Sequence, residues 1–139
     1  MAPMPRYRVI LLPVDDLSGP EQAAAHAALI AGMSGAAVAI LGVIDTSEGF
    51  SFSAEGAAMY DHQRAEVQRV IEAASSILRG AGVRRVEHLI MDGIPREAIL
   101  DVADEQGADL IVLSADRAML DHVTHRARCP VMMVPREGS

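Results

Sequence analysis

The sequence is poor in aromatic residues and cysteine, and it has no long hydrophobic run. It has no tryptophan, two tyrosines and two phenylalanines among 139 residues, so its core must be built from aliphatic side chains and alanine. Because Cys129 is the only cysteine, no intrachain disulfide can form, and we expect a reducing, cytoplasmic location. Apolar stretches such as 36–44 are far shorter than the roughly 20 residues of a membrane-spanning helix, so we expect no membrane association.

Basic charge is scarce as well. Twelve basic residues face 19 acidic ones, which gives a formal net charge of -7. Such a chain repels a phosphate backbone, and it has no basic stripe or aromatic platform to offset the repulsion. Nucleic acid is therefore not an expected partner. The arginines of the N-terminal segment stand beside a strand-like run instead of preceding an apolar core and cleavage site, so no secretory signal is expected.

Apolar strand-like runs alternate with helical patterns along the chain. The run 8–14, RVILLPV, is typical of a strand buried on both faces. A capping-box pattern of Ser18 and Glu21 predicts a helix over 20–32, whose alanines would let it approach a sheet closely. The run 36–44, AAVAILGVI, predicts a second buried strand.

The second half of the chain repeats this alternation. The Ser/Gly-rich segment 46–56 predicts a loop, and apolar residues at helical spacing predict a long helix from about 57 to 79. By the same criteria we expect strands at 86–91, 110–113 and 131–134, a turn at 92–95, and helices at 95–106 and 117–128.

This order predicts the fold class. Strands that alternate with helices form right-handed crossovers and an α/β fold, here a five-stranded parallel open sheet with helices on both faces. We expect a single domain over residues 1–139. Ligands of such sheets bind beyond the carboxyl ends of the strands, which would gather on one rim Asp15, Asp45, Asp92, Gly93 and Ser114.

Several motifs resemble those of the universal stress protein family. They are VILLPVDD in the first strand, a strand ending in VID, DGIPREAILDVADEQGADLIVLS, and the closing CPVMMVP. The resemblance spans nearly the whole chain and implies a Rossmann-like fold. It also implies that Asp15 corresponds to an aspartate that contacts the nucleoside, with the segment 41–44 beside the adenine.

The segment after the fourth predicted strand departs from the family pattern. Members that bind ATP carry G-x-x-G there, then nine residues, then glycine followed by serine or threonine. Those glycines let backbone N–H groups surround the phosphates. Between Leu113 and Cys129 this chain has SADRAMLDHVTHRAR, which contains no glycine, and Arg117 and Ala118 stand in place of the Gly-Ser pair. We therefore expect that the chain does not hold ATP tightly.

These observations support two functional hypotheses. The first is a stress-response regulator that is not an enzyme, needs no cofactor, and acts on an unknown protein partner or small ligand. The alternative is a sensor that binds AMP, ADP or ATP weakly. Its residual site would comprise Asp15, Val43, Asp92, Gly93, Ser114 and Arg117.

The last predicted strand suggests a homodimer. In the family this strand lies at a sheet edge and pairs with its copy in a second subunit. Here the strand is short, apolar and uncharged, and pairing would satisfy the polar backbone groups of an exposed edge. The resemblance places the interface at Val131, Met132, Met133 and Val134.

Several candidate residues also have a purely structural interpretation. Asp15 can cap a turn instead of binding a ligand. His122 and His125 are spaced as metal ligands on one helical face, but a solvated face explains them better. Cys129 precedes a proline at the start of an apolar strand, which favours an inert buried thiol over a redox group.

Two further patterns remain. Ser114 with His122 and Asp121 supplies the residue types of a hydrolase triad, but no G-x-S-x-G elbow surrounds the serine. Phe50 and Phe52 either cover a pocket or contact a partner, or their loop folds over the helix ends.

Overall fold

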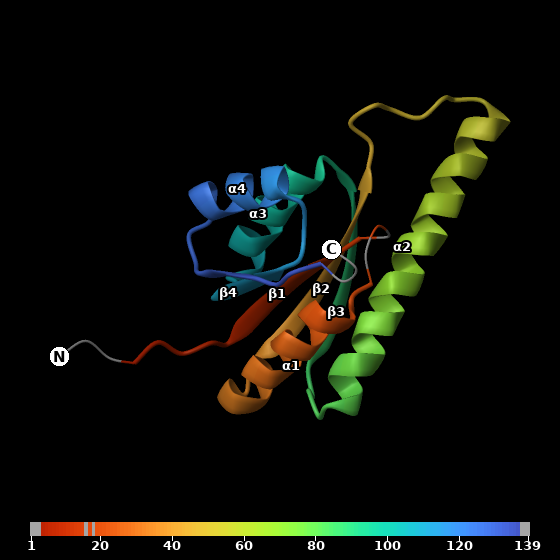
Figure 1. The fold of residues 1–139 in the computed structure, drawn as a ribbon. Helices are drawn as coiled ribbons and strands as arrows, with labels where there is room; N and C mark the ends of the chain where they lie inside the picture. The colour runs from red at the N-terminus through yellow and green to blue at the C-terminus, as the bar shows by residue number, and fades with distance from the viewer. Residues whose placement is uncertain (1–3, 16, 18, 137–139) are drawn as a thin grey trace.

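One parallel sheet organises the molecule. In the computed structural model its five strands run in the order β3-β2-β1-β4-β5 (Figure 1), which confirms the predicted α/β fold. The structure describes residues 4–15, 17 and 19–136. The elements are β1 (Val9–Val14), α1 (Glu21–Ser34), β2 (Ala37–Asp45), α2 (Ala54–Gly80), β3 (Val86–Gly93), α3 (Pro95–Gln106), β4 (Leu110–Leu113), α4 (Arg117–Arg126) and β5 (Val131–Met133).

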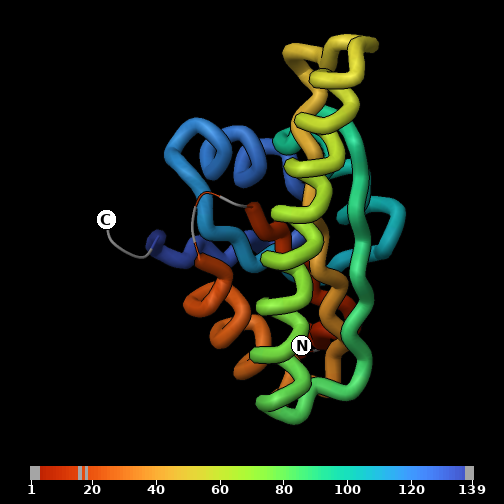
Figure 2. The backbone as a smooth tube through the Cα atoms, turned by 90° about the vertical axis from the view of Figure 1, so that its right-hand side faces the viewer, coloured from red at the N-terminus to blue at the C-terminus, as the bar shows by residue number. Residues whose placement is uncertain are grey.

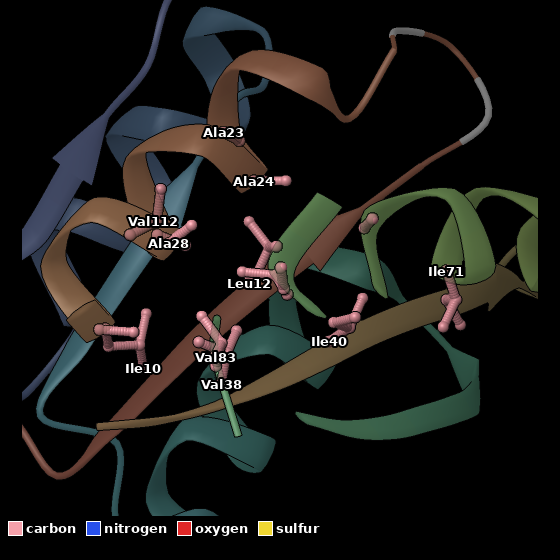
Figure 3. Close-up of a cluster of buried hydrophobic side chains, with 14 of the residues drawn as sticks. Ile10, Leu12, Ala23, Ala24, Ala28, Val38, Ile40, Ile71, Val83 and Val112 are labelled. Atoms are coloured by element: carbon pink, nitrogen blue, oxygen red, sulfur yellow. The ribbon is translucent and has the colours of Figure 1, made fainter. Parts of the chain in front are cut away.

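Helices cover both faces of the sheet, so its central strands are buried on both sides. Ile10 and Leu12 of β1 pack with α1 and α2, whereas Leu11 between them packs with α3 and α4. This alternation is the period of two expected for a strand. The first of the two clusters is drawn in Figure 3.

Helix α1 lies against the sheet through alanine, as its composition predicts. Its buried residues are all small, and Figure 3 shows the helix directly over β1 and β4. They are Ala23, Ala24, Ala27, Ala28 and Ala31. The helix begins at Glu21 with Pro20 as its N-cap residue. Ser18 and Asp16 lie outside the described residues.

Helix α2 is longer than predicted. Its N-cap is Ser53, whose side chain accepts a hydrogen bond from the backbone N–H of Gly56 at 3.1 Å. The helix therefore starts at Ala54, inside the segment that the sequence predicts as loop.

No helix in the described ranges is both long and apolar enough to cross a membrane.

Other boundaries differ by one or two residues. Strand β3 continues to Gly93 because its ladder with β2 extends to the pair Asp45 and Gly93, so the predicted turn does not begin at Asp92. Helix α4 ends at Arg126 instead of Arg128, and β5 ends at Met133. Helix α3 and strand β4 have the predicted bounds.

The link before β4 fixes β4 beside β1. Gly107 ends α3 with φ of 65°, a left-handed conformation that glycine adopts without strain. Asp109 then accepts hydrogen bonds from the backbone N–H groups of Arg8 at 2.7 Å and Val9 at 3.0 Å. Strands β2 and β3 lie on one side of β1, and β4 and β5 lie on the other, so the strand order reverses between β1 and β4. A ligand pocket is expected at the carboxyl ends of these two strands.

Candidate functional site

A pocket lies at this switch point in strand order. Its cavity measures about 280 Å³, near the lower end of the range for small-molecule sites. Apolar side chains from both sheet and helices contribute to it, among them Leu41, Val43, Ile99, Leu113 and Met119. The polar residues that line it are Asp15, Asp45, Ser114, Asp116 and Arg136. We call this the β1/β4 pocket.

Three of the six predicted site residues meet there. Asp15, Val43 and Ser114 line the β1/β4 pocket because β1, β2 and β4 are adjacent. Asp92, Gly93 and Arg117 are not among the residues that line it. Asp92 is instead hydrogen-bonded by the hydroxyl of Tyr60 at 2.7 Å, and Arg117 is exposed at the start of α4.

Asp15 stabilises a turn, which is the structural alternative to ligand binding predicted for it. One carboxylate oxygen accepts a hydrogen bond from the backbone N–H of Leu17 at 3.0 Å, which closes a turn after β1. The other oxygen lies 3.4 Å from Nη2 of Arg136. Both side chains are partly exposed, so water screens this ion pair.

Arg136 is the pocket residue that sequence reasoning missed. Arg117 is the basic residue of the predicted site, but Arg136 lines the pocket and Arg117 does not. A signal was available, because Arg136 follows the last strand closely. The carboxyl ends of parallel strands share one edge, so residues just after β5 reach the same rim as Asp15.

The link between β4 and α4 is short and contains no glycine. It consists of Ser114, Ala115 and Asp116. Asp116 is the N-cap of α4, and its Oδ1 accepts a hydrogen bond from the backbone N–H of Met119 at 2.9 Å. A carboxylate thus occupies the helix N-terminus, where a phosphate would otherwise find unpaired N–H donors.

Tyr60 and Asp92 join α2 to the end of β3. The hydrogen bond to Asp92 is the largest cause of a raised pKa of the Tyr60 hydroxyl, and desolvation adds to it. The pair stabilises the protonated phenol, since the hydroxyl must keep its proton to donate. Asp92 is therefore part of a structural contact.

The candidate metal and redox residues are not arranged for those tasks. No group of three or more His, Cys, Asp or Glu side chains that could hold a metal occurs in the described part of the chain. Nδ1 of His125 lies 2.6 Å from the backbone oxygen of Asp121, within its own helix. Desolvation, with the nearby carboxylates of Asp109 and Asp104, raises the pKa of the Cys129 thiol, which keeps it protonated and poorly reactive.

The fold and the pocket together define an α/β protein with a small switch-point cavity. A model of the universal stress protein family matches residues 6–135, so the chain belongs to that family. It is 28% identical to a universal stress protein of Methanocaldococcus jannaschii, in a match covering 94% of this chain and 83% of that protein.

Solved structures agree with this assignment. The chain is similar to the universal stress protein UspA from Lactobacillus plantarum, with 26% identity, a TM-score of 0.82, and coverage of 93% of this chain and 98% of that one. It also has the fold of the Archaeoglobus fulgidus universal stress protein solved in complex with dAMP. That match has 21% identity, a TM-score of 0.74, and coverage of 94% and 98%.

Proposed function

We propose that this universal stress protein does not grip a polyphosphate, and that it acts in stress regulation by binding a protein partner or a small ligand. The observation that carries the proposal is the β4–α4 link. Its three residues include no glycine to turn backbone N–H groups toward a phosphate, and Asp116 already caps the helix that follows.

The charge around the β1/β4 pocket supports the same conclusion. Asp15, Asp45 and Asp116 supply three carboxylates, and Arg136 is the only basic residue among the described residues that line the pocket. Arg136 already faces Asp15 at 3.4 Å. An added triphosphate would meet net repulsion at this rim, so a neutral or cationic ligand suits it better. We assign no catalytic residue.

The second candidate function is an adenine nucleotide sensor. The apolar residues Leu41 and Val43 lie beside Asp15, in the arrangement that the family resemblance implies for a nucleoside. The Archaeoglobus fulgidus protein of the same fold was solved in complex with dAMP, a nucleoside monophosphate, which is compatible with this alternative. In that case Arg136, and not Arg117, would face the phosphate.

Thermal unfolding with adenosine, AMP and ATP tests the proposal. We expect no stabilisation by any of the three. A real ligand at 100 times its dissociation constant would add about 2.7 kcal/mol to the free energy of unfolding. Stabilisation by ATP would contradict the proposal directly.

Stabilisation by AMP would support the sensor instead, provided that the pocket is responsible. Arg136→Gln should then reduce the shift. Arg117→Gln is the matched control, since it removes the same charge from an exposed position outside the pocket lining. If both variants reduced the shift equally, the nucleotide would be bound elsewhere or by net charge alone.

We also propose a cytoplasmic homodimer that pairs through β5. Among the strands that the structure describes, β5 is hydrogen-bonded to β4 only and forms one edge of the sheet, and its residues are uncharged. Met133 is 63% exposed, which leaves an apolar side chain at that edge. Val131 and Met132 are partly buried, and Val134 is buried in the core of the single chain. A second copy would cover the edge.

A further inference from the structure

The loop before α2 and the first turns of that helix form an arm that projects beyond the sheet. In Figures 1 and 2 the loop between β2 and α2 and the first turns of α2 extend past the ends of the strands. Between Ala54 and Glu66 only Gly56 is buried. We call residues 45–63 the α2 arm. Phe50 and Tyr60 pack against the main core and so attach the base of the arm to the sheet, whereas other side chains of the arm are exposed.

The α2 arm is nevertheless held in a defined conformation. The ring of Phe50 packs edge-on against Tyr60, with centroids 5.5 Å apart and an interplanar angle of 86°. The Tyr60 hydroxyl is anchored on Asp92 of β3. Ser51 Oγ donates to Ser53 Oγ at 2.7 Å, and Ser53 caps the helix. A surface fixed in this way loses little conformational entropy on binding.

This ordered loop holds one aromatic ring entirely in solvent. Phe50 is packed, but Phe52, two residues further on, is fully exposed. Met59, one turn into α2, is 59% exposed. Exposed aromatic and methionine side chains on an ordered element are typical of binding surfaces, where aromatic residues contribute a large share of the energy.

An acidic groove lies beside these side chains. It is open to solvent, measures about 550 Å³, and is lined by Phe50 and Met59 together with acidic and small polar residues. The acidic residues are Asp45, Glu48 and Glu55, and no basic residue lines the groove within the part of the chain that the structure describes. The groove therefore combines apolar side chains with negative charge.

We infer that the α2 arm is a docking surface for a basic, amphipathic segment of another protein. Its apolar side chains would contact Phe52 and Met59, and its cationic side chains would meet the carboxylates of the groove. The charge argues against other occupants. A second copy would place the same three carboxylates opposite themselves, and a nucleic acid or an anionic membrane would be repelled. This surface is separate from the β1/β4 pocket, apart from Asp45, which borders both.

A labelled synthetic peptide of lysine and leucine, arranged as an amphipathic helix, serves as the probe. Its affinity is measured by fluorescence anisotropy at an ionic strength of about 0.15 M, where distant charges are screened. Phe52→Ser should weaken binding by about fivefold or more, as expected for loss of a central aromatic contact. Because Phe52 is fully exposed, the variant should fold and unfold like the parent.

Charge variants show whether the peptide is attracted by the carboxylates of the groove or by the net charge of the whole protein. Glu48→Gln combined with Glu55→Gln should slow association and reduce the salt dependence of binding. Glu72→Gln combined with Asp101→Asn removes the same charge from exposed positions outside the groove. An equal loss of affinity in both double variants would overturn the inference, since the peptide would then be attracted by net charge.

The absence of lysine from the chain allows direct mapping. Carbodiimide activates a carboxylate, a lysine amine of the peptide displaces the activating group to form an amide, and the carbodiimide leaves as a urea. We expect crosslinks at Glu48 and Glu55. Crosslinks only at carboxylates outside the α2 arm would overturn the inference. A change in oligomeric state caused by Phe52→Ser would also overturn it, by showing that a second copy covers the arm.

Discussion

At the scale of single residues, the polar side chains near the pocket stabilise turns and helix ends of the fold. Asp116 caps α4, and Asp15 closes a turn and faces Arg136. Residue types that signal a ligand site in a sequence are also those that satisfy backbone N–H groups at turns and helix ends. The sequence could place Asp15 and Ser114 on the correct edge. It could not show which backbone N–H groups would already donate hydrogen bonds to nearby carboxylates, as Met119 does to Asp116.

His122 gives a test at this scale. Desolvation is the main cause that lowers its pKa below the usual 6.5, and the positive charges of Arg126 and Arg96 lower it further. An NMR titration should therefore give a pKa below 6.5 for His122. Arg96→Gln should raise that value, because it removes a repulsive charge. Arg84→Gln, at the opposite end of β3, is the control and should leave it unchanged.

The same shift has a consequence for stability. Because the folded-state pKa of His122 lies below its unfolded value, the unfolded chain takes up the proton first as the pH falls through 6.5. His122 therefore disfavours the folded state at acid pH and has no effect well above pH 6.5. A pKa for His122 that Arg96→Gln leaves unchanged would contradict the assigned electrostatic cause.

At the scale of elements, close approach of helices to the sheet depends on small residues. Gly42 of β2 lies under α2, where an added Cβ would collide with Val67 and come within 3.0 Å of Ile71 Cδ1. The alanine-rich character of α1 was readable in the sequence and predicted its close packing. The demand for glycine at position 42 was not readable, since a glycine within an apolar run does not reveal which helix crosses above it.

Gly42→Ala should therefore destabilise the protein by about 1–3 kcal/mol, the usual cost of overpacking a core. Denaturant unfolding measures the change. The Gly42→Ala and Val67→Ala double variant should lose less than the sum of the two single variants, because the second substitution removes the colliding methyl group.

Gly32→Ala is the matched control for this substitution. Gly32 is exposed on α1, and an added Cβ would meet nothing within 4 Å. It should stabilise the protein by up to about 1 kcal/mol, because alanine is the better helix former. Equal effects of the two glycine substitutions would show that packing under α2 is not the constraint.

At the scale of the whole molecule, the edge strand β5 is the proposed contact between two copies. Met133→Lys should convert the proposed dimer to a monomer at micromolar concentration, because it places a charge in the apolar edge that the two copies share. Met133 is 63% exposed, so the fold itself should tolerate the change. Sedimentation velocity measures the assembly, and thermal unfolding checks the fold.

Met33→Lys is the control for this prediction. Met33 is 80% exposed on α1, so it introduces the same charge on another apolar surface. It should leave the dimer intact. Dissociation by Met33→Lys alone would move the interface to α1, and a parent protein that sediments as a monomer would contradict dimerisation altogether.

The sequence by itself determined the α/β class, the order of the elements and the family, because these depend on local periodicity and on motifs that follow one another along the chain. Tertiary structure decided which side chains meet. Arg136 joins Asp15 across 121 positions, and Tyr60 reaches Asp92 across 32. Such contacts depend on strand order and on where helices lie over the sheet, which no local pattern of residues encodes.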